Sequence, residues 1–140
     1  MEQVARKTGV LTRRFAGADE LASDLAFRAA QEVLEECPKE EIDGLIFCTQ
    51  SPDHIMPPNA TILQGRLGLP KTVAAFDITL ACSGFVYGLA IAKSMIDSMR
   101  LRNVLLLCGD TYSKYIHPDD RAALVGLCQR VLVGGELAST

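Results

Sequence analysis

The chain has 140 residues, 49% of them hydrophobic, and a formal net charge of −3. This length fits one domain with a real core, and the hydrophobic fraction argues against disorder. Scattered lysines and arginines in a slightly acidic chain form no basic surface for nucleic acid. The longest apolar stretch, residues 73–92, contains Asp77 and is interrupted, so we expect a core segment there and no membrane span.

Residues 19–36 form the clearest predicted helix, because apolar side chains recur at three- and four-residue steps and leave one apolar face. Pro38 ends this pattern. Residues 41–49 are predicted to form a buried strand, since their centre is apolar on both sides, as a parallel sheet requires. Asn59 is a candidate cap for a second helix over residues 59–69.

Residues 73–108 continue the alternation of predicted strands and helices. An apolar strand over residues 73–78 breaks at 79–81, and a helical pattern then continues from 84 to 99. Residues 103–108 form another strand that is apolar on both sides. The fold class is therefore α/β, with right-handed βαβ crossovers, a mainly parallel sheet and helices on both faces. A site in such a fold opens at the carboxyl ends of the strands.

Cys82 lies at such an end, between the strand and the helix that follows it. Unpaired backbone N–H groups and the macrodipole at a helix N-terminus favour the thiolate, which is the form that attacks acyl groups. Its small neighbours Ala81, Ser83 and Gly84 leave room for a substrate carbonyl. The alternative is that Cys82 is a small core side chain, as many free cysteines are.

The other cysteines stand at positions 37, 48, 108 and 128 and form no C-x-x-C pair. With Cys82 the chain has five cysteines, and this odd total, with no signal peptide at the N-terminus, predicts free thiols in a reducing, cytoplasmic setting. His54 has no Cys or His at ligand spacing, so we expect no metal site. No nucleotide or redox cofactor is implied either.

The segment AFDITLACSGFVYGL around Cys82 resembles the nucleophile segment of the 3-oxoacyl-(acyl-carrier-protein) synthase III family of thiolase-like condensing enzymes. The stretches at residues 6–14, 49–70 and 103–121 resemble further parts of that family in the same order. The resemblance covers about residues 4–121. It implies a thiolase-like fold, and we expect residues 1–140 to form one N-terminal half-domain with a divergent tail at 122–140.

The resemblance also implies a function. Cys82 would accept an acyl group from acyl-coenzyme A and condense it with malonyl-carrier protein, in fatty-acid or polyketide-like biosynthesis. Lys7 and Arg121 match positions on the phosphate side of coenzyme A or the acyl carrier protein, although Lys7 also fits a solvated basic segment. Met56 matches a residue that crosses a dimer interface and lines the partner's acyl pocket; it also fits an ordinary loop. His117 is not expected to act as a base, because the family's catalytic His comes from the C-terminal half.

That family also takes its catalytic Asn from the C-terminal half, which this sequence does not match. We therefore expect a chain that is acylated at Cys82 but is incomplete for condensation. The helix at residues 84–99 is apolar around most of its circumference, which predicts a homodimer or a complementary C-terminal half as partner. Two alternatives remain: an inactive truncated remnant or interaction subunit of such an enzyme, and another thiolase-like acyl-coenzyme A activity.

Overall fold

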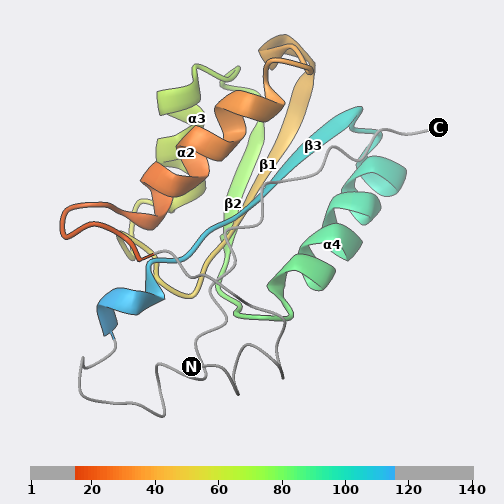
Figure 1. Ribbon diagram of the computed structural model, residues 1–140. Coiled ribbons are helices and arrows are strands. Elements are labelled where there is room, and N and C mark those ends of the chain that lie inside the picture. Colours follow the sequence, from red (N-terminus) through yellow and green to blue (C-terminus); the bar gives the residue numbers. More distant parts are fainter. Residues whose placement is uncertain (1–14, 116–140) are drawn as a thin grey trace, which may run out of the picture.

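The computed structural model describes residues 15–115, which form a sheet with helices on both faces (Figure 1). The strands are β1 (Ile42–Cys48), β2 (Ala74–Ile78) and β3 (Asn103–Cys108). The helices are α2 (Ala22–Val33), α3 (Asn59–Leu67) and α4 (Gly84–Met99), with short 3-10 helices at Lys39–Glu41 and Tyr112–Tyr115. The strand order is β2-β1-β3 and both pairings are parallel. The predicted parallel α/β architecture is confirmed.

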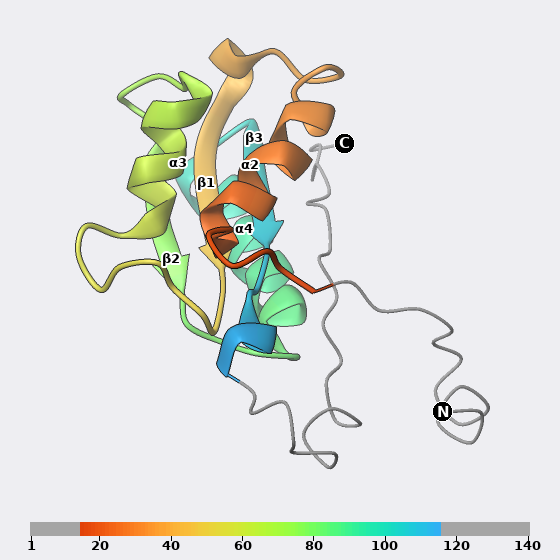
Figure 2. The same cartoon turned by 60° about the vertical axis from the view of Figure 1, so that its left-hand side comes forward.

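Alternation along the strands divides the core into two layers. Leu45, Phe47 and the neighbouring β3 residues Leu105 and Leu107 face α2 and α3. Ile46, Val104 and Leu106 face α4 instead. Because successive side chains of a strand point to opposite faces, a strand that is apolar throughout needs a helix on each side. Figure 2 shows this arrangement, with α2 and α3 in front of the sheet and α4 behind it.

Helix α2 is shorter than the predicted 19–36 at both ends. At its start, the Asp53 carboxylate accepts hydrogen bonds from the main-chain N–H groups of Ala22 and Ser23, at 3.0 and 3.4 Å. At its end, the chain tightens into turns after Val33, where the N–H of Glu36 donates to the Val33 carbonyl at 3.1 Å. A carboxylate at the helix N-terminus satisfies N–H groups that have no partner within the helix. A residue from a distant loop therefore fixes where α2 begins.

Helix α3 is capped by β2, and not by the Asn59 side chain as the sequence suggested. The Asp77 carboxylate accepts hydrogen bonds from the main-chain N–H groups of Asn59 and Ala60, both at 2.7 Å. Asn59 is the first helical residue, and its side-chain amide also donates to Asp77, at 3.1 Å. The prediction of Asn59 as the cap was wrong because local sequence does not show a cap that arrives from a neighbouring strand. This bond set explains the carboxylate in an otherwise apolar strand.

Candidate active site

Cys82 lies in the turn that leads from β2 into α4, as predicted, and it is exposed. The turn is narrow: the Leu80 N–H donates to the Ile78 carbonyl at 3.2 Å, and the Gly84 N–H donates to the Ala81 carbonyl at 2.9 Å. Cys82 therefore lies beside the first turn of α4, where main-chain N–H groups outnumber their acceptors. A thiol at this place is reachable by a substrate and close to donors that can stabilise negative charge.

Two glycines let α4 lie close against the sheet behind this turn. A Cβ on Gly84 would stand 2.1 Å from the Cys48 sulfur, and a Cβ on Gly88 would stand 2.7 Å from Cδ1 of Leu106. Contacts this short cannot be accommodated without movement of the neighbouring atoms. The glycines at these two positions therefore set the depth at which the start of α4, and with it Cys82, is held over the strand ends.

Two further thiols lie at the strand ends, where Cys48 of β1 and Cys108 of β3 are in register. The Cys48 thiol donates a hydrogen bond to the Leu80 carbonyl at 3.6 Å, just before the turn that carries Cys82. The hydrogen bond with Cys48, together with burial, raises the pKa of the Cys108 thiol above its usual value. At neutral pH, Cys108 is therefore a neutral hydrogen-bonding partner for Cys48.

A carboxylate after β3 orders the neighbouring loop at the same edge of the sheet. Asp110 accepts hydrogen bonds from the hydroxyls of Thr49 and Ser51, at 2.8 and 2.9 Å. It also accepts the N–H groups of Gln50 and Ser51, at 2.8 and 3.1 Å. The Thr111 N–H returns a bond to the Ser51 hydroxyl at 2.8 Å. This closed set of bonds fixes the start of the loop that follows β1.

Met56 lies on that loop and is 77% exposed, next to Ile55, which is 95% exposed. Because the loop follows β1 and the Cys82 turn follows β2, the parallel topology places both at the carboxyl edge of the sheet. Lys7, Arg121 and His117 lie outside the described residues. The structure thus brings Cys82 and Met56 to one edge of the sheet, and the role of each remains a prediction.

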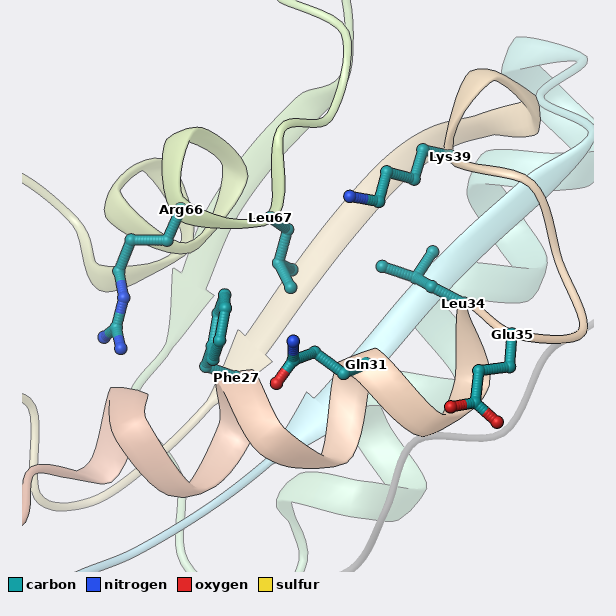
Figure 3. A pocket seen from close by; sticks show the side chains of 7 residues that line it. All are labelled: Phe27, Gln31, Leu34, Glu35, Lys39, Arg66 and Leu67. Atoms are coloured by element: carbon teal, nitrogen blue, oxygen red, sulfur yellow. The ribbon is translucent and has the colours of Figure 1, made fainter.

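A separate groove of about 360 Å³ opens between α2 and α3, on the other face of the sheet from α4 (Figure 3). Its lining is partly apolar and partly polar, and consists of Phe27, Leu34, Leu67, Gln31, Glu35, Lys39 and Arg66. Arg66 is already engaged: its guanidinium lies 2.8 Å from the Asp24 carboxylate and 4.7 Å from the centre of the Phe27 ring. Because the groove lies on the face of the sheet opposite α4, it does not belong to the Cys82 site.

Within residues 15–115, no three His, Cys, Asp or Glu side chains are grouped so that they could hold a metal ion. In the same part of the chain, no helix is both long and apolar enough to cross a membrane.

Comparison with known proteins shows which family the chain is similar to. The family model for 3-oxoacyl-[acyl-carrier-protein (ACP)] synthase III matches residues 76–136. The beta-ketoacyl-[acyl-carrier-protein] synthase III of Clostridioides difficile is 42% identical over 127 residues, which are 89% of this chain and 38% of that protein. The enzyme of the same name from Chlamydia caviae is 38% identical over 126 residues, 89% of this chain and 37% of its own length. Over 89% of its own length, the chain therefore matches part of the 3-oxoacyl-(acyl-carrier-protein) synthase III family.

The solved structures agree with this assignment. A crystal structure of a 3-oxoacyl-(acyl-carrier-protein) synthase III superposes with a TM-score of 0.83 at 44% identity, over 89% of this chain and 37% of that one. The thiolase-like fold predicted from the resemblance is therefore confirmed for the matched part. The chain spans less than two fifths of the length of these synthase III relatives, so the activity of a whole synthase is a proposal for this chain.

The sequence predicted the place of Cys82 but not the residues that surround its turn. Cys48 and Cys108 each end an apolar strand, where a cysteine is indistinguishable from an ordinary core residue. Their in-register position could have been inferred only once the strands were known to be neighbours. Asp110 carried a better signal, because a polar residue two positions after a buried strand in a parallel sheet lies at the edge where sites form.

Proposed function

We propose that Cys82 is the acyl-accepting nucleophile of a condensing enzyme of the 3-oxoacyl-(acyl-carrier-protein) synthase III type, and that this chain supplies its nucleophile segment. One observation carries the proposal. An exposed cysteine stands at the carboxyl edge of a parallel sheet, directly before a helix, in a segment that the family model matches. A cysteine kept only for packing has no need of that exposure.

The first step is transfer of the acyl group to sulfur. The Cys82 thiolate attacks the carbonyl carbon of an acyl-coenzyme A thioester, and negative charge builds on the carbonyl oxygen. Main-chain N–H groups at the start of α4 are the available donors for that oxygen. The carbon–sulfur bond to coenzyme A then breaks, and coenzyme A leaves as its thiolate, which takes a proton from water. Cys82 is left as an acyl thioester.

The second step forms a carbon–carbon bond. Malonyl-carrier protein loses carbon dioxide, and the resulting carbanion attacks the acyl-Cys82 carbonyl. The Cys82 thiolate leaves, and the product is a 3-oxoacyl group on the carrier protein. The resemblance assigns the His and Asn for this step to a part of the family outside the segment matched here. Condensation therefore depends on residues supplied by that part, whereas acylation of Cys82 does not. The expected pathway is fatty-acid biosynthesis.

Apolar residues on the exposed side of α4 are an argument that this chain binds a partner. Val86 and Tyr87, one turn beyond Cys82, are 67% and 58% exposed, and Met99 at the other end of the helix is 58% exposed. A helix with apolar residues on its solvent side is typical of an interface. We infer that a second copy or a complementary C-terminal half covers it. Met56 would then contact the acyl chain across that interface, and Lys7 and Arg121 would contact the phosphate side of coenzyme A or the carrier protein.

Similarity to other condensing enzymes is lower. The tetronic acid condensing enzyme AbyA1 is 31% identical with a TM-score of 0.72, and OleA of Xanthomonas campestris is 26% identical with a TM-score of 0.68. The synthase III structure reaches 44% and 0.83. These values favour the synthase III reaction over another thiolase-like activity.

Incubation with acetyl-coenzyme A followed by intact-mass measurement tests the proposal. We expect the chain to gain the mass of one acetyl group and the Cys82→Ala variant to gain none. Cys37→Ala is the matched control, because Cys37 is a buried cysteine in the core layer on the α2 and α3 side of the sheet. The Cys37→Ala variant should be acetylated like the unchanged chain. Absence of an adduct, with and without a complementary C-terminal half, would favour an interaction subunit that performs no chemistry.

A further inference from the structure

Cys48 touches the Cys82 turn on both of its sides. Its sulfur donates a hydrogen bond to the carbonyl of Leu80, which precedes Cys82, at 3.6 Å. The same sulfur occupies the space beneath Gly84, which follows Cys82, where an added Cβ would be only 2.1 Å away. Cys48 is 3% exposed. Its side chain therefore fills the floor on which the turn rests.

The two sides of this contact are held by different kinds of bonds. Cys48 ends the central strand and is in register with Ile78 of β2 and Cys108 of β3. The Gly109 N–H donates to the Cys48 carbonyl at 3.2 Å, just beyond that strand. The turn is held by its own main-chain hydrogen bonds, and Ser83, which precedes α4, adds no side-chain capping bond. Because Cys48 is paired with a strand on each side, we expect a change in its side chain to move the turn and not the sheet.

We propose that Cys48 is a positioning residue for Cys82: its thiol sets the height and orientation of the turn, and thereby the reactivity of the Cys82 sulfur. The importance of this positioning role for catalysis rests on the proposed function. The contact between the Cys48 side chain and the turn does not depend on that function. Cys108 contributes indirectly, as the neutral hydrogen-bonding partner of Cys48. Without the sulfur, the turn settles into the vacated space, which takes the Cys82 sulfur out of solvent and out of line with the first N–H groups of α4.

The rate at which iodoacetamide alkylates Cys82, followed by peptide mass spectrometry on the full chain at fixed neutral pH, tests this proposal. Cys48→Ala should slow alkylation about fivefold, the factor that corresponds to one ordinary hydrogen bond. Cys48→Ser keeps a donor for the Leu80 carbonyl and should recover most of the rate. Cys37→Ala removes a cysteine that is equally buried, at 3% exposure, and should leave the rate unchanged.

A second variant separates positioning from a general loss of stability. Adding Gly84→Ala to Cys48→Ala places a methyl group in the vacated space, 3.8 Å from the remaining Cβ of residue 48 and 3.2 Å from Cβ of Leu80. The double variant should alkylate at a rate closer to that of the unchanged chain than Cys48→Ala alone does. An unchanged rate in Cys48→Ala, or an equal loss in Cys37→Ala, would overturn the proposal.

The alkylation assay keeps this proposal distinct from the acyl-transfer function, because iodoacetamide needs no coenzyme A site. If Cys48→Ala slows alkylation while the unchanged chain takes no acetyl group, Cys48 positions Cys82 and the proposed function fails. If Cys48→Ala accepts both reagents as fast as the unchanged chain, the function stands and the positioning role is wrong.

Discussion

Gly84→Ala should be one of the most informative single substitutions in the described part of the chain. The new Cβ would lie 2.1 Å from the Cys48 sulfur and 3.2 Å from Cβ of Leu80. Cys48 has a short side chain in the central strand, so it can relieve the contact only by turning about its single side-chain torsion or by moving the backbone. Overpacking of this kind costs about 1–3 kcal/mol. The higher helix propensity of Ala offsets at most about 1 kcal/mol of that cost.

We therefore expect Gly84→Ala to lower the free energy of unfolding by roughly 1–2 kcal/mol, as measured by urea denaturation followed by circular dichroism. Gly65→Ala is the matched control, because a Cβ at Gly65 in α3 meets nothing within 4 Å. That variant should be neutral or more stable by up to about 1 kcal/mol.

The combination with Cys48→Ala sharpens this test, because removing the sulfur removes the shorter of the two contacts and leaves only the 3.2 Å contact with Cβ of Leu80. The two substitutions together should be less destabilising than the sum of the single effects, by about 1–3 kcal/mol. If Gly84→Ala is as stable as Gly65→Ala, or if its effect adds to that of Cys48→Ala without coupling, the close contact between α4 and β1 is refuted.

Three further predictions concern carboxylates. Asp77→Ala removes the cap of α3 and should cost about 2 kcal/mol in urea denaturation; a loss below a few tenths would contradict the capping role. Asp110→Ala leaves buried donors after β1 without an acceptor and should lower the free energy of unfolding by about 2–3 kcal/mol. An unchanged free energy of unfolding would show that these hydrogen bonds are dispensable. The Arg102 side chain and its N–H hold the pKa of Asp43 below its usual 3.8. This pair therefore stabilises the fold above about that pH and loses its effect as the pH falls through the lowered pKa. Asp43→Asn should flatten the dependence of stability on pH below 4, and an unchanged acid profile would contradict this.

Periodicity in the sequence predicted the elements well where burial decides them. The bounds of β3 were predicted without error, because its apolar residues 104–108 lie between a polar pair, Arg102 and Asn103, and the sequence Gly109-Asp110. The helix ends were less predictable. Asp53 and Asp77 fix the starts of α2 and α3 from loops and strands that are distant in sequence. Bonds of this kind depend on the finished topology, so a window of neighbouring residues does not contain them.

In the candidate site, the position of Cys82 was predictable from the sequence, but the residues that pack beneath its turn were not. A cysteine between an apolar strand and an apolar helix, in a sequence that resembles a known nucleophile segment, predicted the place and the exposure of Cys82. The sulfur beneath Gly84 was not predictable, because it belongs to a strand far away in the chain. The roles of Lys7 and Arg121 remain predictions, since both lie outside the described residues.

The most direct test of the account is to locate the acyl group after incubation with labelled acyl-coenzyme A. We expect the label on the peptide that contains Cys82, and we expect neutral hydroxylamine to release it, as it releases an acyl group bound to sulfur. A label on another residue, or one that hydroxylamine leaves in place, would contradict the claim that Cys82 accepts the acyl group.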